Sequence, residues 1–95
     1  MREASRSMRD VDVVVYMVEP WRTVHEGDRA ALARLAEDER PVLVLVNKID
    51  RARGSDLEET LLAYAELDVV TELIPMSAVS GRGLDEAVAT IVAHL

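Results

Sequence analysis

Three apolar runs rich in β-branched residues divide the chain: residues 11–18 (VDVVVYMV), 42–46 (VLVLV) and 69–76 (VVTELIPM). The first two are almost continuously apolar, which is typical of strands buried on both faces, as in a parallel sheet that helices cover. The third is more mixed, and Glu72 indicates partial exposure. We therefore expect three strands, of which the first two are enclosed.

Stretches with helical spacing separate these runs. The first extends from Asp28, a candidate N-cap, to about Glu39, and Pro41 prevents it from continuing. The second follows Ser55 and Glu58, which have the spacing of a capping box. The apolar faces of the helices, including one that follows residue 83, comprise Ala31, Leu32, Leu35, Ala36; Leu57, Leu61, Leu62, Ala65; and Leu84, Ala87, Val88, Ile91, Leu95.

The order of these elements predicts the fold class. Residues 1–10 resemble the end of a further helix, so the pattern is α-β-α-β-α-β-α, which favours right-handed crossovers in a parallel sheet. We therefore expect an α/β fold in which helices flank a three-stranded parallel sheet in three layers. Ninety-five residues correspond to one small domain or part of one, and no internal repeat or linker divides them.

The composition excludes several classes of function. The chain has 18 Asp and Glu against 11 Lys and Arg, and binding to nucleic-acid phosphates needs clustered positive charge. We therefore expect that this chain alone does not bind RNA or DNA. It has no cysteine, and its two histidines are far apart, so a metal site is not expected. No apolar run reaches membrane-spanning length and the N-terminus lacks a signal-peptide core, which favours the cytoplasm.

Polar residues follow the second and third strands. Ligands of parallel α/β proteins bind outside the carboxyl ends of the strands. Asn47, Lys48 and Asp50 follow the second strand, and Ser77 and Ala78 follow the third. Because these strands should be neighbours, we expect the two segments to converge.

These groups suit the recognition of guanine. The Asp50 carboxylate can accept two parallel N–H bonds from a ring nitrogen and its neighbouring amine, a pair that adenine does not offer. Asn47 can meet a ring nitrogen and brace a loop, and Lys48 can lay its stem across the ring. The small Ala78 leaves its backbone N–H open to a carbonyl oxygen. For Ser77, a turn before a helix explains the residue as well as a site does.

The polar segments resemble motifs of P-loop GTPases. NKID at residues 47–50 matches N-K-x-D, and SAVSGRGLDEAV resembles S-A-x-x-G-x-G. The sequence around these motifs is similar to the GTPase domain of the Era family, which acts in small-subunit ribosome assembly. Other bacterial GTPases share both motifs. The resemblance covers essentially the whole chain and implies GTP or GDP as ligand. It places Asn47 and Asp50 on guanine edges and Lys48 on the base, with Ser77 and Ala78 completing the pocket.

Other motifs of that family do not occur in the 95 residues: G-x-x-x-x-G-K-[ST], the switch threonine and D-x-x-G. The resemblance therefore implies that residues 1–95 are a C-terminal part of an Era-type GTPase domain, without its Walker A loop and switch regions. The KH domain, through which the parent would contact ribosomal RNA, is also absent. Met1 is then an internal residue of a longer parent, an alternative start or an engineered boundary.

This partial resemblance limits the expected activity. We expect no catalytic residue, no GTP hydrolysis and no Mg²⁺ held by this chain alone. Base recognition should be weak or absent in isolation, with a dissociation constant of about 1 mM, or about −4 kcal/mol.

A different function is also open. In the family's sheet order a further strand lies beside residues 11–18, so this run becomes an exposed apolar edge. The chain could then be a marginal or self-associating monomer, or a non-catalytic α/β module that acts through protein contacts at this edge. Trp21 is expected to pack on the surface, and Gly81 and Gly83 to serve turns.

Overall fold

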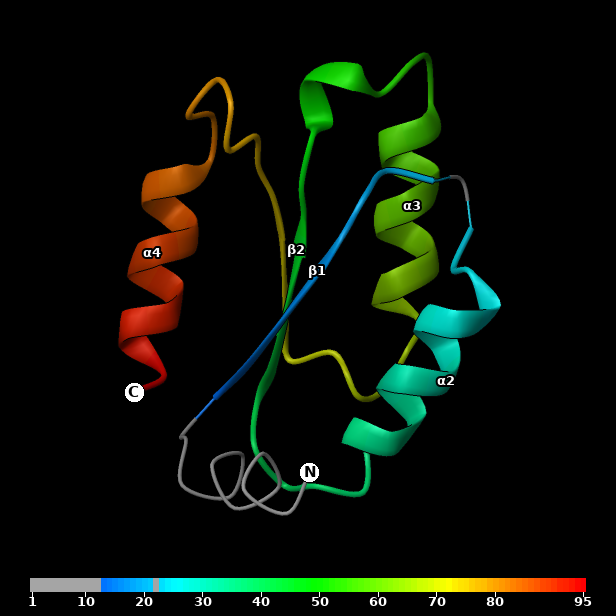
Figure 1. Cartoon of the computed structure of the whole chain (residues 1–95), viewed down its shortest axis with the longest axis vertical. Helices are drawn as coiled ribbons and strands as arrows, with labels where there is room; N and C mark the ends of the chain where they lie inside the picture. The colour runs from blue at the N-terminus through cyan, green and yellow to red at the C-terminus, as the bar shows by residue number, and fades with distance from the viewer. Residues whose placement is uncertain (1–12, 22) are drawn as a thin grey trace.

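A computed structural model describes residues 13–21 and 23–95. Within these residues, parallel strands form one sheet in the order β1 (Val14–Val18), β2 (Val42–Val46) and β3 (Glu72–Pro75). The connecting elements are α2 (Glu26–Leu35), the single 3₁₀ turn η1 (Ile49–Arg51), α3 (Asp56–Ala65) and α4 (Leu84–Ala93). Figure 1 shows α4 on one face of the sheet and α2 and α3 on the other. The predicted three-layer α/β fold is confirmed, while the helix expected over residues 1–10 lies outside the described residues.

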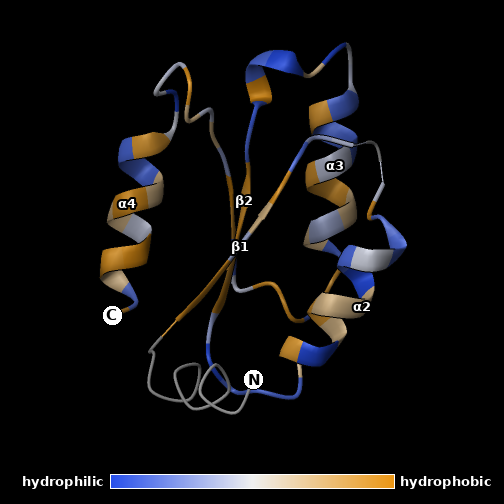
Figure 2. Cartoon of the chain, in the orientation of Figure 1, coloured by the Kyte–Doolittle hydropathy of each residue, from blue (hydrophilic) through white to orange (hydrophobic). Residues whose placement is uncertain are grey.

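Strand β2 is enclosed on both faces. All of its residues are buried, as its uniformly apolar sequence predicted, and its bounds are those expected. On one face, Val44 belongs to a core with Leu32 and Tyr64 of the helices α2 and α3. On the other face, Leu45 packs with Ala87 of α4. Figure 2 shows this central strand as an apolar layer between helices of mixed polarity.

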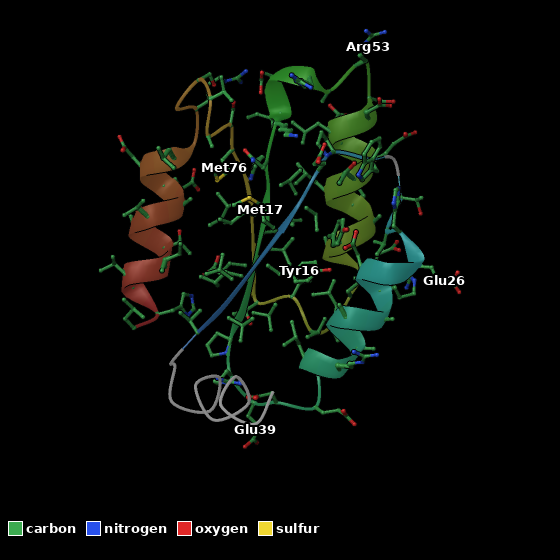
Figure 3. The ribbon with its side chains drawn as sticks, in the orientation of Figure 1. Tyr16, Met17, Glu26, Glu39, Arg53 and Met76 are labelled. Carbon is green, nitrogen blue, oxygen red and sulfur yellow. The ribbon has the colours of Figure 1, made fainter. Side chains whose placement is uncertain are left out.

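Strand β1 is covered on only one face. Tyr16 packs against the core on the side of α2 and α3, whereas Val15 and Met17 are 41% and 54% exposed. Figure 3 shows Tyr16 and Met17 on opposite sides of the sheet. The prediction that the first run is buried on both faces was wrong, because α4 packs on β2 and β3 and leaves β1 uncovered. Residues 11 and 12 of that run lie outside the described part of the chain.

Helix α2 differs from its prediction at both ends. It begins at Glu26 and ends at Leu35, so Asp28 lies in its first turn and is not its N-cap. The Asp28 carboxylate instead accepts hydrogen bonds from the hydroxyls of Tyr16, at 2.6 Å, and Tyr64, at 3.3 Å. The prediction failed because these partners come from other elements, β1 and α3, and not from the helix itself.

The remaining elements match the sequence more closely. Ser55 precedes α3 as predicted, but at φ −91° and ψ 11° its backbone is not extended, and its side chain makes no capping hydrogen bond. β3 is shorter than the apolar run, because Val69 and Val70 pack against the core from the loop before it. α4 follows Gly83 as predicted.

Candidate functional site

The loops after β2 and β3 meet at the carboxyl edge of the sheet, as predicted. The Asn47 N–H donates to the carbonyl of Val18 at 2.8 Å, and the Met76 N–H donates to the carbonyl of Val46 at 2.8 Å. The hydrogen bonding of the sheet therefore continues to the first residue after β2 and the first residue after β3. The Ile49 N–H then donates to the carbonyl of Met76 at 3.3 Å, which joins the two loops directly. Asn47, Asp50, Ser77 and Ala78 form a hydrogen-bonded group at this edge, which we call the polar corner.

A buried serine orients the exposed carboxylate of the corner. The Ser77 hydroxyl donates to Asp50 Oδ1 at 2.8 Å and accepts from the Ser80 N–H at 3.2 Å. Ser77 is fully buried, whereas Asp50 is exposed. Within the described residues, Asp50 Oδ2 has no hydrogen-bond partner. The serine therefore fixes the carboxylate through Oδ1, which keeps a second lone pair, so both oxygens can accept from a ligand.

The asparagine of the corner is held by the second loop. The Ala78 N–H donates to Asn47 Oδ1 at 3.0 Å. The sequence analysis predicted that this N–H is free to donate to a ligand carbonyl. In the structure it is not free, because Asn47 Oδ1 accepts its hydrogen bond. Asn47 Nδ2 then faces Met17, at 3.6 Å from its sulfur, which is a weak acceptor. The Nδ2 donor of Asn47 is therefore the side of its carboxamide that is available to a ligand acceptor.

Lys48 lies between the strand and the corner in an unusual conformation. Its φ of 63° is the only positive value at a non-glycine residue in the described chain. A left-handed conformation costs about 1–2 kcal/mol at such a residue and is concentrated at functional sites. The Lys48 ammonium lies 3.5 Å from a carboxylate oxygen of Glu19, and both side chains are about half-exposed. The sequence analysis did not identify Glu19, although its position directly after β1 places it at the same edge.

Two clefts adjoin Lys48 on the side of β1, with volumes of about 450 and 250 Å³. Glu19, Trp21 and Lys48 line both of them, and Asn47 lines the larger. The other lining residues are Met17, Val18 and Asp28 in the larger cleft and Pro20, Arg51, Arg53 and Asp56 in the smaller. Asp50, Ser77 and Ala78 line neither cleft. The structure therefore brings the predicted residues to one edge of the sheet, and of these Asn47 and Lys48 line the two clefts.

Several other predicted features have structural roles. Trp21 is half-exposed and stacks on His25 with ring centroids 5.3 Å apart, as expected for surface packing. Gly81 and Gly83 both have positive φ, which fits the turns predicted there.

Among residues 13–21 and 23–95, no group of at least three His, Cys, Asp or Glu side chains could hold a metal ion. None of the helices in the same ranges has the length and apolar character that crossing a bilayer requires.

Comparison with known proteins assigns the chain to a family. The sequence model of the elongation factor Tu GTP binding domain matches residues 1–95. The chain belongs to this GTP-binding domain family. It is 36% identical over 85 residues to GTPase Era of Clostridium botulinum strain Hall, across 90% of this chain and 29% of that protein. It is 33% identical over 95 residues to GTPase Era of Clostridium kluyveri, across 100% of this chain and 32% of that protein.

A solved structure supports the same relationship within this GTP-binding domain family. A variant of Aquifex aeolicus Era bound to GDP·AlF4− superposes with a TM-score of 0.73 and 26% identity, covering 99% of this chain and 32% of that chain. This likeness confirms the P-loop GTPase type of α/β fold that the resemblance implied. The chain spans only 29% to 32% of the length of these relatives.

Proposed function

We propose that this chain recognises the guanine base of GTP and GDP through Asn47, Lys48, Asp50, Ser77 and Ala78. The observation that carries the proposal is the bond from the buried Ser77 hydroxyl to Asp50, which fixes this carboxylate at the edge where the Ala78 N–H of the same loop fixes Asn47. Membership of a GTP-binding domain family supports the class of ligand. The Era structure bound to GDP·AlF4− supports it further.

Each side chain has a separate role in this proposal. The Asp50 carboxylate accepts from the ring N1–H and the 2-amino group of guanine, and Asn47 Nδ2 donates to N7. The Lys48 stem covers one face of the ring, while Ser77 and Ala78 hold the two readers in place. Adenine would place its N1 lone pair against the Asp50 carboxylate and leave both acceptors without a proton. Such an unpaired polar contact costs about 1–3 kcal/mol, which is the basis of the expected selectivity.

We also propose that binding by this chain alone is weak and that it does not hydrolyse GTP. Asp50 lies outside both clefts, so the base would stay partly in contact with water, and we expect a dissociation constant of about 1 mM. The 95 residues contain neither G-x-x-x-x-G-K-[ST] nor D-x-x-G. The chain therefore lacks the groups with which P-loop GTPases hold phosphates and Mg²⁺.

The biological setting follows from the Era relatives and is part of the proposal. Because the chain matches about three-tenths of their length, we propose that it corresponds to the C-terminal part of an Era-type GTPase domain. Small-subunit ribosome assembly in the cytoplasm would then be the role of the parent protein, with ribosomal RNA bound by a KH domain outside these residues. The alternative of a non-catalytic module that acts through protein contacts is favoured by the exposed side chains of Val15 and Met17.

Titration of the amide NMR spectrum with GDP and separately with ADP tests the base reader. We expect GDP to shift resonances of residues 47–50 and 77–78 and ADP to leave them unchanged. Asp50→Asn should abolish the GDP response, whereas Asp68→Asn, the same change at an exposed residue after α3, should retain it. Equal responses to the two nucleotides, or GDP shifts confined to other residues, would contradict the proposal.

A further inference from the structure

Glu19 leaves β1 directly beside the first residues of the polar corner. Val18 pairs with Val46 in the register, and the Asn47 N–H donates to the carbonyl of Val18, so the residues after β1 and β2 leave the sheet side by side. The Lys48 ammonium lies 3.5 Å from a carboxylate oxygen of Glu19. Among the described residues, neither of these two side chains has another ion-pair partner.

The backbone of Lys48 is fixed, so its side chain is the part that Glu19 can direct. Lys48 has φ 63° and ψ 37°, and its carbonyl accepts from the Arg51 N–H at 2.9 Å. The next N–H, of Ile49, donates to the carbonyl of Met76. The flexible four-carbon stem of a lysine samples many rotamers unless a partner at its end selects among them. The Glu19 carboxylate is such a partner.

Asp50 carries the carboxylate that would otherwise attract the Lys48 ammonium. Only one residue separates the two, so their Cα atoms are at most about 7 Å apart, within the reach of a lysine side chain. Asp50 is exposed, and its carboxylate can accept further hydrogen bonds beside the one from Ser77. In the described chain, however, Lys48 forms no ion pair with Asp50, and its ammonium lies at Glu19 instead.

An ion pair between Lys48 and Asp50 would compete with guanine. The ring N1–H and the 2-amino group need the oxygens of Asp50, so an ammonium bonded there would have to be displaced before the base could bind. If the competing pair is present for about half to four-fifths of the time, the apparent dissociation constant rises about two- to fivefold. The attraction between two exposed side chains of opposite charge is large enough to produce populations of this size.

We propose that Glu19 is a positioning residue of the base reader. It holds the Lys48 ammonium on the side of β1 and thereby keeps the Asp50 carboxylate free to accept from guanine. Glu19 itself does not contact the base and acts only through Lys48. This inference rests on the proposed function, because it assumes that Asp50 and Lys48 bind the base.

Titration of Glu19→Gln with GDP tests the inference, because a positioning role and a plain charge effect predict opposite results. Glutamine keeps the size of the side chain and removes its charge, so we expect GDP to bind about two- to fivefold more weakly. A carboxylate that acted only by its charge would repel the anionic nucleotide, and its removal would strengthen binding. Glu66→Gln makes the same change at an exposed residue, at the end of α3 away from the corner, and should leave the affinity unchanged.

Lys48→Met provides the second arm of the test. Methionine keeps an unbranched apolar stem that can cover the ring, but it has no ammonium for Glu19 to hold. Adding Glu19→Gln to this variant should therefore not change its affinity for GDP. The coupling between the two substitutions should equal the loss of about two- to fivefold that Glu19→Gln causes alone. Circular dichroism confirms that all the variants fold.

Nuclear Overhauser contacts of the Lys48 Hε protons, recorded without nucleotide, give a readout that does not depend on binding. These protons should contact Glu19 Hγ in the parent chain and Asp50 Hβ in Glu19→Gln. A parent chain that does not respond to GDP would contradict the base reader and this inference together.

Other outcomes would overturn this inference alone. One is a parent chain that responds to GDP while Glu19→Gln binds it equally well or more tightly. Another is an equal loss of affinity when Glu19→Gln is added to Lys48→Met. A third is the absence of contacts between Lys48 and Glu19 in the parent chain.

Discussion

Strands β1 and β2 lie side by side with similar apolar sequences, but their surroundings differ. Every residue of β2 is buried, and Asn47 and Asp50 after it form hydrogen bonds with the loop after β3. β1 exposes Val15 and Met17, and within the described residues its outer backbone groups have no partner. An apolar run thus identifies a strand, but the elements packed around it decide its burial. The enclosed strand leads into the polar corner, whereas the partly exposed strand leads into the loop that carries Glu19 and Trp21.

Substitutions of Met17 and Leu45 give the most direct comparison of the two strands, because these residues pair in the register and lie on the same face of the sheet. Leu45 is 4% exposed, so Leu45→Ala should lower the free energy of unfolding by about 3 kcal/mol. Met17→Ala should lower it by less than about 1 kcal/mol, because half of that side chain already contacts water. Urea unfolding at concentrations where the chain is monomeric measures both, and equal losses would contradict the difference in burial.

Gly83 tests whether the corner depends on the tight turn that leads into α4. A Cβ atom there would lie 2.4 Å from the carbonyl oxygen of Pro75, and the residue has a φ of 71°. Gly83→Ala should therefore cost about 2–3 kcal/mol of stability and displace the Ser77 loop. Gly27→Ala is the matched control, because nothing lies within 4 Å of its Cβ and alanine favours the helix. A Gly83→Ala protein as stable as the control would show that the turn is not constrained.

The pH dependence of the free energy of unfolding tests the packing of Tyr16 and Tyr64 on the covered face of β1. The hydrogen bond to Asp28, burial and the charge of that carboxylate raise the pKa of Tyr16 from 10.0 to about 12, and burial is the main cause of the raised pKa of Tyr64. The folded state thus holds these protons more tightly than the unfolded chain. The free energy of unfolding should be unaffected by them below pH about 10 and should fall as the pH rises towards about 12.

Tyr16→Phe supplies the control for this pH effect. It removes the hydroxyl bonded to Asp28 but keeps the apolar ring, so the decline in stability at alkaline pH should become shallower. Urea unfolding at several pH values, followed with the ultraviolet absorbance of tyrosinate, measures both quantities. Identical pH profiles for the two proteins would show that this hydrogen bond does not hold the Tyr16 proton.

The sequence predicted the meeting of the two loops better than the surroundings of β1. Asn47 and Ser77 could be placed together because the carboxyl ends of neighbouring parallel strands meet at one edge. The exposure of Met17 could not be predicted, since it depends on where α4 packs and not on the strand's own residues. Asp28 was assigned to a cap because its tyrosine partners lie 12 and 36 residues away. The engagement of the Ala78 N–H by Asn47 likewise depends on the approach of two loops.

The central claim, that Asp50 reads the guanine edge, is tested most directly by changing the base and the side chain together. Xanthine carries a carbonyl where guanine has its 2-amino group, so the amide of Asp50→Asn can donate to that carbonyl and accept from N1–H. We predict that the parent chain responds to GDP and not to xanthosine diphosphate in the amide NMR spectrum. The variant should reverse this preference, with a change of roughly tenfold or more for each nucleotide. An unchanged preference for GDP in Asp50→Asn would contradict the account.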